Sequence, residues 1–356
     1  MDIVNAAYAF CYNGSPTSCH EFGRGHINTT LMVHTDVGNS YVLQKINNYV
    51  FKEPEKVMAN ASAVTNHVRQ RSNEPYAALH YIPTHDGKYY HLDENGEYWR
   101  MYEFVPGVGL EAPNCDDDLY QSALAFGRFQ EHLADFPIDT LYETIPNFHN
   151  TIDRYRLLKE SVAADAAGRV ASVQKELEFL LSKEEQVSVL QKMLDRGELP
   201  IRVTHNDTKF NNVLLDEQTH KCLCVIDLDT VMPGSSLFDF GDAIRSGASH
   251  GGENETDPTK ICLDLHLFEV YTRGYLDAAK SLTPREIDML PVSALVMATE
   301  LATRFLKDYL DGDLYFKIDH PEHNLIRARS QIYLAMDMEK KLPEMQRIVT
   351  ELRNTK

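Results

Sequence analysis

The hydrophobic pattern of the sequence changes once, near residue 105, and this change limits the folds that the chain can adopt. Before it, short runs rich in β-branched and aromatic residues predict strands joined by turns. After Pro106 and Gly107, apolar residues recur every three or four positions, a pattern typical of helices. The predicted strands span residues 27–34, 40–46, 89–92 and 98–105, with one helix at 54–71, and the later helices span 117–136, 151–167, 172–196, 260–280, 284–310 and 324 onward, with a short β segment at 201–231.

The change in pattern indicates a boundary between two lobes. The chain has 356 residues, a length at which a single compact core stops growing efficiently. We therefore predict an α+β fold with a small β-rich N-lobe, residues 1–105, and a larger, mainly helical C-lobe, residues 106–356. A cleft between two such lobes is the expected place for chemistry.

Charge and cysteine content exclude several classes of protein. The 35 basic and 53 acidic residues give a formal net charge of −18, whereas a general nucleic-acid or anionic-membrane binder needs the opposite bias. Six cysteines without a C-x-x-C pair indicate neither a zinc ribbon nor a disulfide framework, and they favour reduced thiols in a cytoplasm. The N-terminus lacks the pattern of a signal peptide, and no stretch supplies about 18 uninterrupted apolar residues, so we expect no membrane span.

One segment of the predicted C-lobe carries the pattern H-x-D-x-x-x-x-N. Its members are His205, Asp207 and Asn212, and an apolar run follows them. Protein kinases place a catalytic Asp and a metal-binding Asn at the same spacing. The residue types suit this chemistry, because a carboxylate accepts a hydrogen bond from an attacking hydroxyl and an amide oxygen coordinates the ion that bridges the phosphates. Asp207 is therefore the candidate base, and Asn212 is a candidate ligand of Mg²⁺.

A predicted hairpin brings a second acidic residue to this loop. The turn at residues 216–220 separates two apolar runs, and the second run ends at Asp227, which would return beside Asn212. Asp227 is thus the second candidate metal ligand. The triplet at residues 239–241 spells the D-F-G of protein kinases but lies farther along the chain, and we interpret its lettering as a coincidence.

Each of these polar residues, taken alone, is more often a turn residue or a helix cap than a ligand. The Asn spacing, the hairpin and the Asp at the end of the second strand together favour a phosphotransferase. Cys222 and Cys224 are interpreted as neighbours on a strand, because one C-x-C pair offers too few ligands for a metal.

Two features of the predicted N-lobe suit a nucleotide. Gly23 and Gly25 lie between β-like runs, where their backbone N–H groups would reach phosphates, although a tight hairpin uses glycine in the same way. The run that ends at Pro106 predicts a strand leading into the hinge, where the backbone of Glu103 and Val105 would meet an adenine edge. The alternative for this run is a strand that ends at a Pro-Gly turn.

The loop at residues 205–212, the run I-D-L-D at 226–229 and the run F-D-F-G-D at 238–242 resemble the choline kinase and aminoglycoside phosphotransferase superfamily. The members of that superfamily share a protein-kinase-like fold, so the resemblance implies this fold, ATP as co-substrate and Mg²⁺ as cofactor. It also implies that Asp207 is the catalytic base.

The resemblance leaves the phosphate-pairing residue of the N-lobe open. Kinase-like folds carry a basic residue for this purpose on the strand predicted at residues 40–46. Gln44 stands where much of the superfamily has that residue, and the neighbouring Lys45 points to the opposite face of a strand. We assign the nucleotide contact to Lys45, with another basic residue as the alternative.

Within the superfamily, the resemblance is closest to the N-acetylhexosamine 1-kinase branch, which phosphorylates the anomeric hydroxyl of N-acetylglucosamine or N-acetylgalactosamine. The resemblance implies that His26, Arg304 and Tyr315 contact the sugar together with Asp207 and Asp227. Imidazole, guanidinium and carboxylate groups ordinarily hold sugar hydroxyls by directed hydrogen bonds. The matching segments run through both lobes and include residues 25–30, 41–47, 202–234, 304–316 and 321–325.

The three branch-specific residues also have simpler interpretations. His26 would cap a strand turn, and Tyr315 would be a core aromatic residue with a wet hydroxyl. Arg304 lies in a predicted helix, where a surface ion pair with Glu300 or Asp308 is the alternative.

The sequence therefore predicts an ATP- and Mg²⁺-dependent sugar 1-kinase that releases the sugar 1-phosphate and ADP, without a nucleic-acid or membrane partner. An amino alcohol or an aminoglycoside is the alternative acceptor for the same fold. An inactive sugar- or nucleotide-binding regulator is disfavoured by the intact catalytic motif, and no pair of carboxylates has a spacing that fixes a glycosidase site. The preferred epimer and the oligomeric state stay open.

Overall fold

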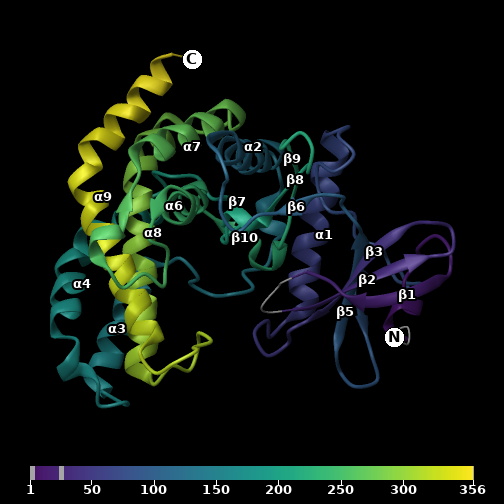
Figure 1. Ribbon diagram of the computed structural model, residues 1–356, viewed down its shortest axis with the longest axis horizontal. Helices are drawn as coiled ribbons and strands as arrows, with labels where there is room; N and C mark the ends of the chain where they lie inside the picture. The colour runs from purple at the N-terminus through teal and green to yellow at the C-terminus, as the bar shows by residue number, and fades with distance from the viewer. Residues whose placement is uncertain (1–4, 24–27, 356) are drawn as a thin grey trace.

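The structure, a computed structural model, describes residues 5–23 and 28–355 and has the two-lobed α+β architecture that the sequence predicts (Figure 1). Within these residues the N-lobe holds a five-stranded antiparallel sheet in the order β1-β2-β3-β5-β4. The prediction of a small β-rich lobe is confirmed. Its strands are β1 (Pro16–Glu21), β2 (Thr29–Thr35), β3 (Ser40–Ile46), β4 (His91–Leu92) and β5 (Tyr98–Glu103).

The two faces of this sheet pack against different elements. On one face, Leu43 of β3 and its register partner Met101 of β5 are fully buried in a cluster that includes the short helix η1 (Asn5–Ala9). On the other face lies α1 (Pro54–Arg71), whose first turn begins with a proline and whose buried residues recur every three or four positions. The sheet and α1 therefore form one unit that carries the upper wall of the cleft.

β5 leads through residues 104–107 into the C-lobe, and the predicted boundary between residues 105 and 106 lies in this connection. The C-lobe is mainly helical, and its helices pack around α8 (Pro284–Asp311). α2 (Asp116–His132) packs on α7 (Leu265–Ala278), which in turn contacts α9. The elements in contact with α8 are α3 (Thr151–Ala164), α4 (Gln174–Val187), α6 (Ser236–Gly247) and α9 (His323–Asn354), the last of which runs along the outer edge in Figure 1.

Short strands lie between the helical C-lobe and the N-lobe, as predicted for residues 201–231. Of these, β7 (Arg202–Thr204) pairs with β10 (Met232–Gly234), and β8 (Val213–Leu215) pairs with both β6 (Val108–Gly109) and β9 (Cys222–Val225). The β8–β9 pair is the predicted hairpin. Its turn is closed by the carboxylate of Asp216, which accepts from the Thr219 amide at 2.7 Å.

Two helices differ from the sequence prediction. The segment 172–196 forms α4 and α5 (Val189–Asp195) with a break at Ser188, whose hydroxyl donates to the Glu184 carbonyl at 2.7 Å and so competes with the helical bonding pattern. The segment 260–280 begins with the strand β12 (Cys262–Leu263), and α7 starts only at Leu265. The Asp264 side chain caps that start, accepting from the His266 amide at 2.8 Å.

α8 is, among the described residues, the helix that is long and apolar enough to cross a membrane by length and composition. Its most apolar window has a mean hydropathy of 1.3, but 78% of that window is buried inside the protein. The apolar residues of α8 therefore belong to the core of the C-lobe.

Candidate active site

The loop that carries the candidate base begins where β7 ends. Its backbone amides are held by side chains of α6. The buried carboxylate of Asp239 on α6 accepts from the amides of His205 at 2.9 Å and Asn206 at 2.8 Å. Asp242, one turn later, accepts from the Thr208 amide at 3.1 Å. The triplet D-F-G at 239–241 is thus part of α6, the helix whose side chains bind the backbone of the loop. The Asp239 carboxylate of this triplet is occupied by backbone amides, and the interpretation of the lettering as a coincidence stays a prediction.

His205 joins this loop to the β8–β9 hairpin. Its ring is fully buried, lies edge-on to Phe126 and Phe129, and places Nε2 2.8 Å from the Ile226 carbonyl. The Thr230 hydroxyl donates to the His205 carbonyl at 2.7 Å. The histidine of the motif is therefore a structural residue that sets the distance between the loop and the segment containing Asp227.

Asp207 and Asn212 meet within the loop. The Nδ2 of Asn212 donates to the backbone carbonyl of Asp207 at 2.7 Å and to its Oδ2 at 3.2 Å. The Asn212 amide group is thereby oriented, since its nitrogen is bound to Asp207 and its Oδ1 is the remaining acceptor. The Asp207 side chain is 29% exposed, so an acceptor hydroxyl has access to it.

The structure brings Asp227 to the same place. Val213 pairs with Val225 in the hairpin, and the Ile226 amide donates to the Asn212 carbonyl at 2.9 Å. Asp227 has a backbone φ of 61°, a conformation that a non-glycine residue adopts at a cost and that turns the chain after β9. The residue as a whole is exposed. Loss of hydration and the negative charges of Asp229 and Asp207 raise the pKa of Asp227 to about 6.

This donor set fits a magnesium ion. Among the residues that the structure describes, no three His, Cys, Asp or Glu side chains are placed to hold a metal, so a metal here depends on the mixed amide and carboxylate pair. Asn212 Oδ1 and the Asp227 carboxylate are hard oxygen donors, the kind that Mg²⁺ prefers. Loss of hydration is the main cause of the raised pKa of Asp227, and the neighbouring carboxylates add to it; a divalent cation would favour the charged form.

Lys209 is a candidate functional residue that the sequence reasoning missed. Its Nζ lies 3.0 Å from Asp207 Oδ1, and the Asp207 charge raises the pKa of Lys209. The lysine is two positions after Asp207 in the loop, so the pattern D-x-K was the signal that could have found it. A cation in contact with the candidate base suits a reaction in which phosphate oxygens approach that base.

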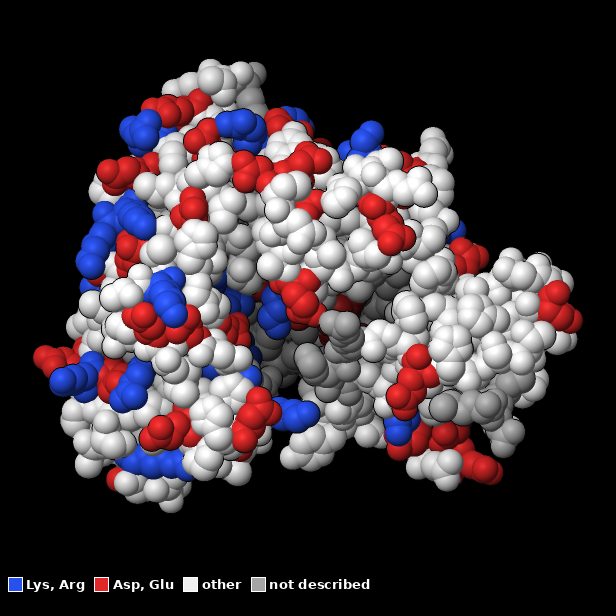
Figure 2. Space-filling view, in the orientation of Figure 1, with Lys and Arg blue, Asp and Glu red and all other residues white. Residues whose placement is uncertain are grey.

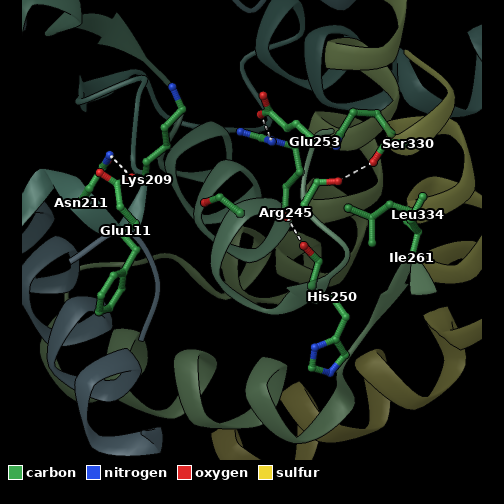
Figure 3. A pocket seen from close by; sticks show the side chains of 14 residues that line it. Glu111, Lys209, Asn211, Arg245, His250, Glu253, Ile261, Ser330 and Leu334 are labelled. Carbon is green, nitrogen blue, oxygen red and sulfur yellow. Dashed lines mark hydrogen bonds and ion pairs between the residues drawn. The ribbon is translucent and has the colours of Figure 1, made fainter. Parts of the chain in front are cut away.

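Beside Lys209 the C-lobe contains a cavity of about 310 Å³ (Figure 3). Arg245 lies in its middle, and its guanidinium is bound to Glu253 at 2.7 Å. Gln331 also lines the cavity, and its buried Oε1 has no hydrogen-bond partner among the described residues. Figure 2 shows the surface hollowed where the two lobes meet, with acidic and basic side chains at its edges. The cavity has the size of a small-molecule pocket.

The sequence profile of the phosphotransferase enzyme family matches residues 18–263, which include both candidate metal ligands, the catalytic loop and the hinge. The chain belongs to this phosphotransferase family.

Solved structures show the same fold at low sequence identity. An aminoglycoside phosphotransferase from Alicyclobacillus acidocaldarius is 13% identical, with a TM-score of 0.65 over 99% of this chain and 98% of that one. A choline kinase from Cryptosporidium parvum is 14% identical, with a TM-score of 0.59 over 96% and 92% of the two chains. An amicoumacin kinase, solved with AMP-PNP and Ca²⁺, is 11% identical, with a TM-score of 0.61 over 95% and 91%.

In this phosphotransferase, Arg304 and Tyr315 lie together. The Arg304 guanidinium is 6.0 Å from the centre of the Tyr315 ring and 4.9 Å from that of Phe148. The Tyr315 side chain is well exposed, so it is not the core aromatic of the alternative interpretation. The backbone of this residue is held by Asp308, whose Oδ1 accepts from its amide at 2.8 Å.

Two buried hydrogen bonds connect α8, the helix of Arg304, to the loop at residues 205–212. Glu300, one turn before Arg304 on α8, binds His149 Nδ1 at 2.8 Å, and His149 Nε2 lies 3.3 Å from the Asn206 carbonyl. The positive charge of Arg304 is one cause of the lowered pKa of Glu300, after burial, which opposes it, and His149. Arg304 therefore lies on a helix, α8, that also supports the loop, and Tyr315 follows the end of that helix.

The structure describes only some of the N-lobe residues that the sequence assigns to nucleotide or sugar contacts. Gly25 and His26 lie outside the described residues, while Gly23 has a φ of 78° that glycine adopts easily. Glu103 binds His80 at 2.9 Å, and Val105, buried in the hinge, accepts from the Gly107 amide at 2.9 Å. The nucleotide contacts assigned to Gly23, Gly25, Glu103 and Val105, and the sugar contact of His26, stay predictions.

Lys45 and Gln44 point to opposite faces of β3, as the alternation of a strand requires. Lys45 forms an ion pair with Glu97 at 3.4 Å, and both side chains are partly exposed. Gln44 instead accepts a hydrogen bond from the Nε of Arg100 at 2.9 Å, on the face turned toward α1 and the cleft. The nucleotide contact assigned to Lys45 stays a prediction, and Arg100 is a second basic residue that the sequence reasoning missed.

Proposed function

We propose that this phosphotransferase transfers the γ-phosphoryl group of ATP to the anomeric hydroxyl of an N-acetylhexosamine and releases the sugar 1-phosphate and ADP. N-acetylglucosamine and N-acetylgalactosamine are the proposed acceptors, and a cytoplasmic location is part of the same proposal. The observation that carries the phosphotransfer is the position of Asp207, which contacts Asn212 on one side and Lys209 on the other and faces the segment of Asp227.

The residues have distinct roles in this reaction. Asp207 accepts a hydrogen bond from the acceptor hydroxyl, orients it and takes its proton. Lys209 faces the negative charge of the transferred group. Asn212 and Asp227 would hold Mg²⁺, which when bound supplies positive charge beside the β- and γ-phosphates. Because phosphoryl transfer has a loose transition state, the positions of these charges matter more than the basicity of Asp207.

Two features of the C-lobe support a sugar as the acceptor. Arg304 and the exposed Tyr315 offer a guanidinium and a phenol, and Glu300, one turn before Arg304, is joined to the loop at residues 205–212 through His149. Gln331 lines the cavity next to Lys209, and its buried Oε1, which has no partner among the described residues, needs an N–H or O–H donor. An acetamido group and several hydroxyls are such donors.

A cationic acceptor is the second candidate. Glu111 and Glu253 line the same cavity, and the names of two structural relatives, an aminoglycoside phosphotransferase and a choline kinase, refer to amine-bearing acceptors. Glu253 is bound to Arg245, however, and Lys209 also lines the cavity, so an ammonium group would meet two cations there. This arrangement favours a neutral polar acceptor.

The deciding experiment measures ADP release from ATP and Mg²⁺ with each N-acetylhexosamine, with its 1-deoxy analogue, and with choline, ethanolamine and an aminoglycoside. We expect turnover with the free sugars, none with the 1-deoxy analogues, and loss in Asp207→Asn with an unchanged melting temperature. The matched control is Asp195→Asn, an exposed carboxylate on α5.

Three results would count against parts of the proposal. Turnover with the amines alone would replace the sugar by an amine acceptor. Near-normal turnover by Asp207→Asn would remove Asp207 from the catalytic position. No ATP turnover with any acceptor would favour an inactive binding protein.

A further inference from the structure

A buried ion pair joins the two lobes directly behind Asp227. The guanidinium of Arg100 on β5 contacts the carboxylate of Asp229, and the two side chains are 2% and 3% exposed. Asp229 is two residues after Asp227, within the short helix η5 (Leu228–Thr230). A pair of charges buried this deeply is expensive unless hydrogen bonds hold both partners, and its loss on one side leaves the other charge unbalanced.

Both partners are held by further hydrogen bonds. Gln44 accepts from Arg100 Nε at 2.9 Å, and the second Asp229 oxygen accepts from Asn28 Nδ2 at 2.7 Å. The Oδ1 of Asn28 in turn accepts from the Asn47 amide at 2.9 Å. The carboxylate of Asp229 is thereby tied to the N-lobe by two side chains, although it belongs to the C-lobe segment.

The location of this pair corresponds to that of an ion pair with a known function in kinase-like folds. In protein kinases a lysine of strand β3 pairs with a glutamate of the following helix, and this pair must be formed for activity. Here β3 offers Gln44, whose register partner on β5 is Arg100, and the nearest α1 side chain is Met58, whose sulfur is 3.8 Å from Arg100 Nη1. In this chain the basic residue, Arg100, stands on β5 instead of β3. Its acidic partner, Asp229, stands in the segment after Asp227 instead of in the helix.

The electrostatic setting gives the pair a specific role. Asp227 directly precedes η5, and the Asp229 carboxylate of η5 lies against the Arg100 guanidinium of the N-lobe. Without Arg100 the buried Asp229 carboxylate would lose its cationic partner, and η5 would lose one of its contacts with the N-lobe. Asp227 lies at the start of η5 and has a strained backbone, so its position depends on how η5 is held.

We propose that Arg100, through Asp229, is a positioning residue for Asp227 and sets the Mg²⁺-dependent part of nucleotide binding. The proposal rests on the proposed ATP- and Mg²⁺-dependent function and names how the N-lobe controls its metal site. Residues that hold a metal ligand from behind typically change metal affinity by about 10- to 100-fold when they are removed.

The test measures binding of three probes by calorimetry, without any acceptor: ADP with Mg²⁺, ADP with EDTA, and adenosine. We expect Arg100→Met to weaken binding of ADP with Mg²⁺ by about 10- to 100-fold and to leave ADP in EDTA and adenosine within about twofold. Arg100→Lys, which keeps the charge, should lie between Arg100→Met and the wild type. The matched control, Arg71→Met, removes an exposed N-lobe arginine that pairs with Asp135 and should change none of the three affinities.

Other outcomes overturn the inference. An equal loss for all three probes would mean that Arg100 only stabilises the fold. A loss for ADP that persists in EDTA would mean a direct contact between Arg100 and the phosphates. If Arg100→Met does not fold, the same comparison is made between the wild type and the double variant Arg100→Met/Asp229→Asn, which has no unpaired buried charge; a Mg²⁺ dependence equal to that of the wild type would reject the coupling.

The wild type separates this inference from the proposed function. Wild-type protein whose ADP affinity does not depend on Mg²⁺ would count against the metal site itself. Wild-type dependence on Mg²⁺ that is fully retained in Arg100→Met would count against the role of Arg100 alone.

Discussion

The carboxylate of Asp239 lies 2.9 Å from the backbone amide of His205 and accepts its hydrogen bond. The same carboxylate accepts from the Asn206 amide at 2.8 Å and from Gln130 Nε2 at 3.1 Å, so each of these three partners is a donor. Burial raises the pKa of Asp239, and the bonds from the two amides oppose that rise. The start of the catalytic loop therefore depends on an acceptor that belongs to a helix.

Asp239→Asn should loosen this loop, because the new NH₂ group would face donors that need an acceptor. We expect a loss of about 1–3 kcal/mol in the free energy of unfolding, together with a lower kcat, and measure both by urea unfolding and ADP release. Asp195→Asn on α5 is the control, since its carboxylate is exposed and accepts a hydrogen bond from its neighbour Gln191. Unchanged stability and turnover would show that the amides find water as an alternative partner.

Lys209→Met should lower kcat by about 100-fold at an unchanged melting temperature, because it removes a cation 3.0 Å from Asp207 without leaving a buried charge. Steady-state ADP release and thermal unfolding check the two parts of the prediction. Lys192→Met removes a lysine paired with Glu185 on the surface and should leave kcat unchanged. Equal kcat values for the two variants would limit Lys209 to a surface role.

Glu286 gives the fold an acid-sensitive ion pair. Burial raises the pKa of Glu286, but bonds from Arg202, the Thr283 amide and Ser236 outweigh burial and hold the pKa below its ordinary value of 4.5. An acid with a lowered folded pKa contributes stability above its unfolded pKa, and this contribution is lost as the pH falls through the folded value. Protonation of Glu286 should therefore weaken the fold below about pH 4.5.

Glu286→Gln should cost about 3–5 kcal/mol at pH 7, because it leaves the Arg202 charge without its partner. Guanidinium unfolding at a series of pH values should show the difference from the wild type shrinking below about pH 4.5. Glu185→Gln, an exposed glutamate paired with Lys192, serves as the comparison and should change stability by less than about 1 kcal/mol. A difference that stays constant with pH would mean that the Glu286 pair does not titrate in this range.

Gly241 permits the close crossing of α6 and α8. A Cβ at this position would lie 2.5 Å from the Ser293 carbonyl oxygen and 2.6 Å from Met297 Cγ. Gly241→Ala should therefore cost about 1–3 kcal/mol in unfolding free energy, in spite of the better helix propensity of alanine.

Gly247→Ala, at the end of the same helix, is the matched control. Its Cβ would meet only Leu119 Cδ1 at 3.2 Å, the mobile end of a side chain. Thermal unfolding of the two variants should thus separate close backbone packing from helix propensity. A Gly241→Ala variant as stable as Gly247→Ala would show that α8 shifts at little cost.

The sequence could predict the two-lobed fold and the hairpin because these depend on patterns between near neighbours. Period-two and three-to-four-residue spacings indicate strands and helices directly. Asn212 and Asp227 are brought together by the turn at Asp216 and by pairing between adjacent strands, a local event. The helix expected at 172–196 was predicted less well, because the side chain of Ser188 bonds to the backbone at the break.

The sequence by itself thus determined the order of strands and helices and the loop that holds Asp207 beside Asn212. Only the tertiary structure decided which residues support that loop. Arg100 and Asp229 are 129 positions apart, and His149 and Glu300 are 151 apart, so no periodicity or spacing connects them. Such pairs form because the packing of the lobes and helices brings distant residues together. A charge that is buried there is costly unless a partner charge and hydrogen bonds balance it.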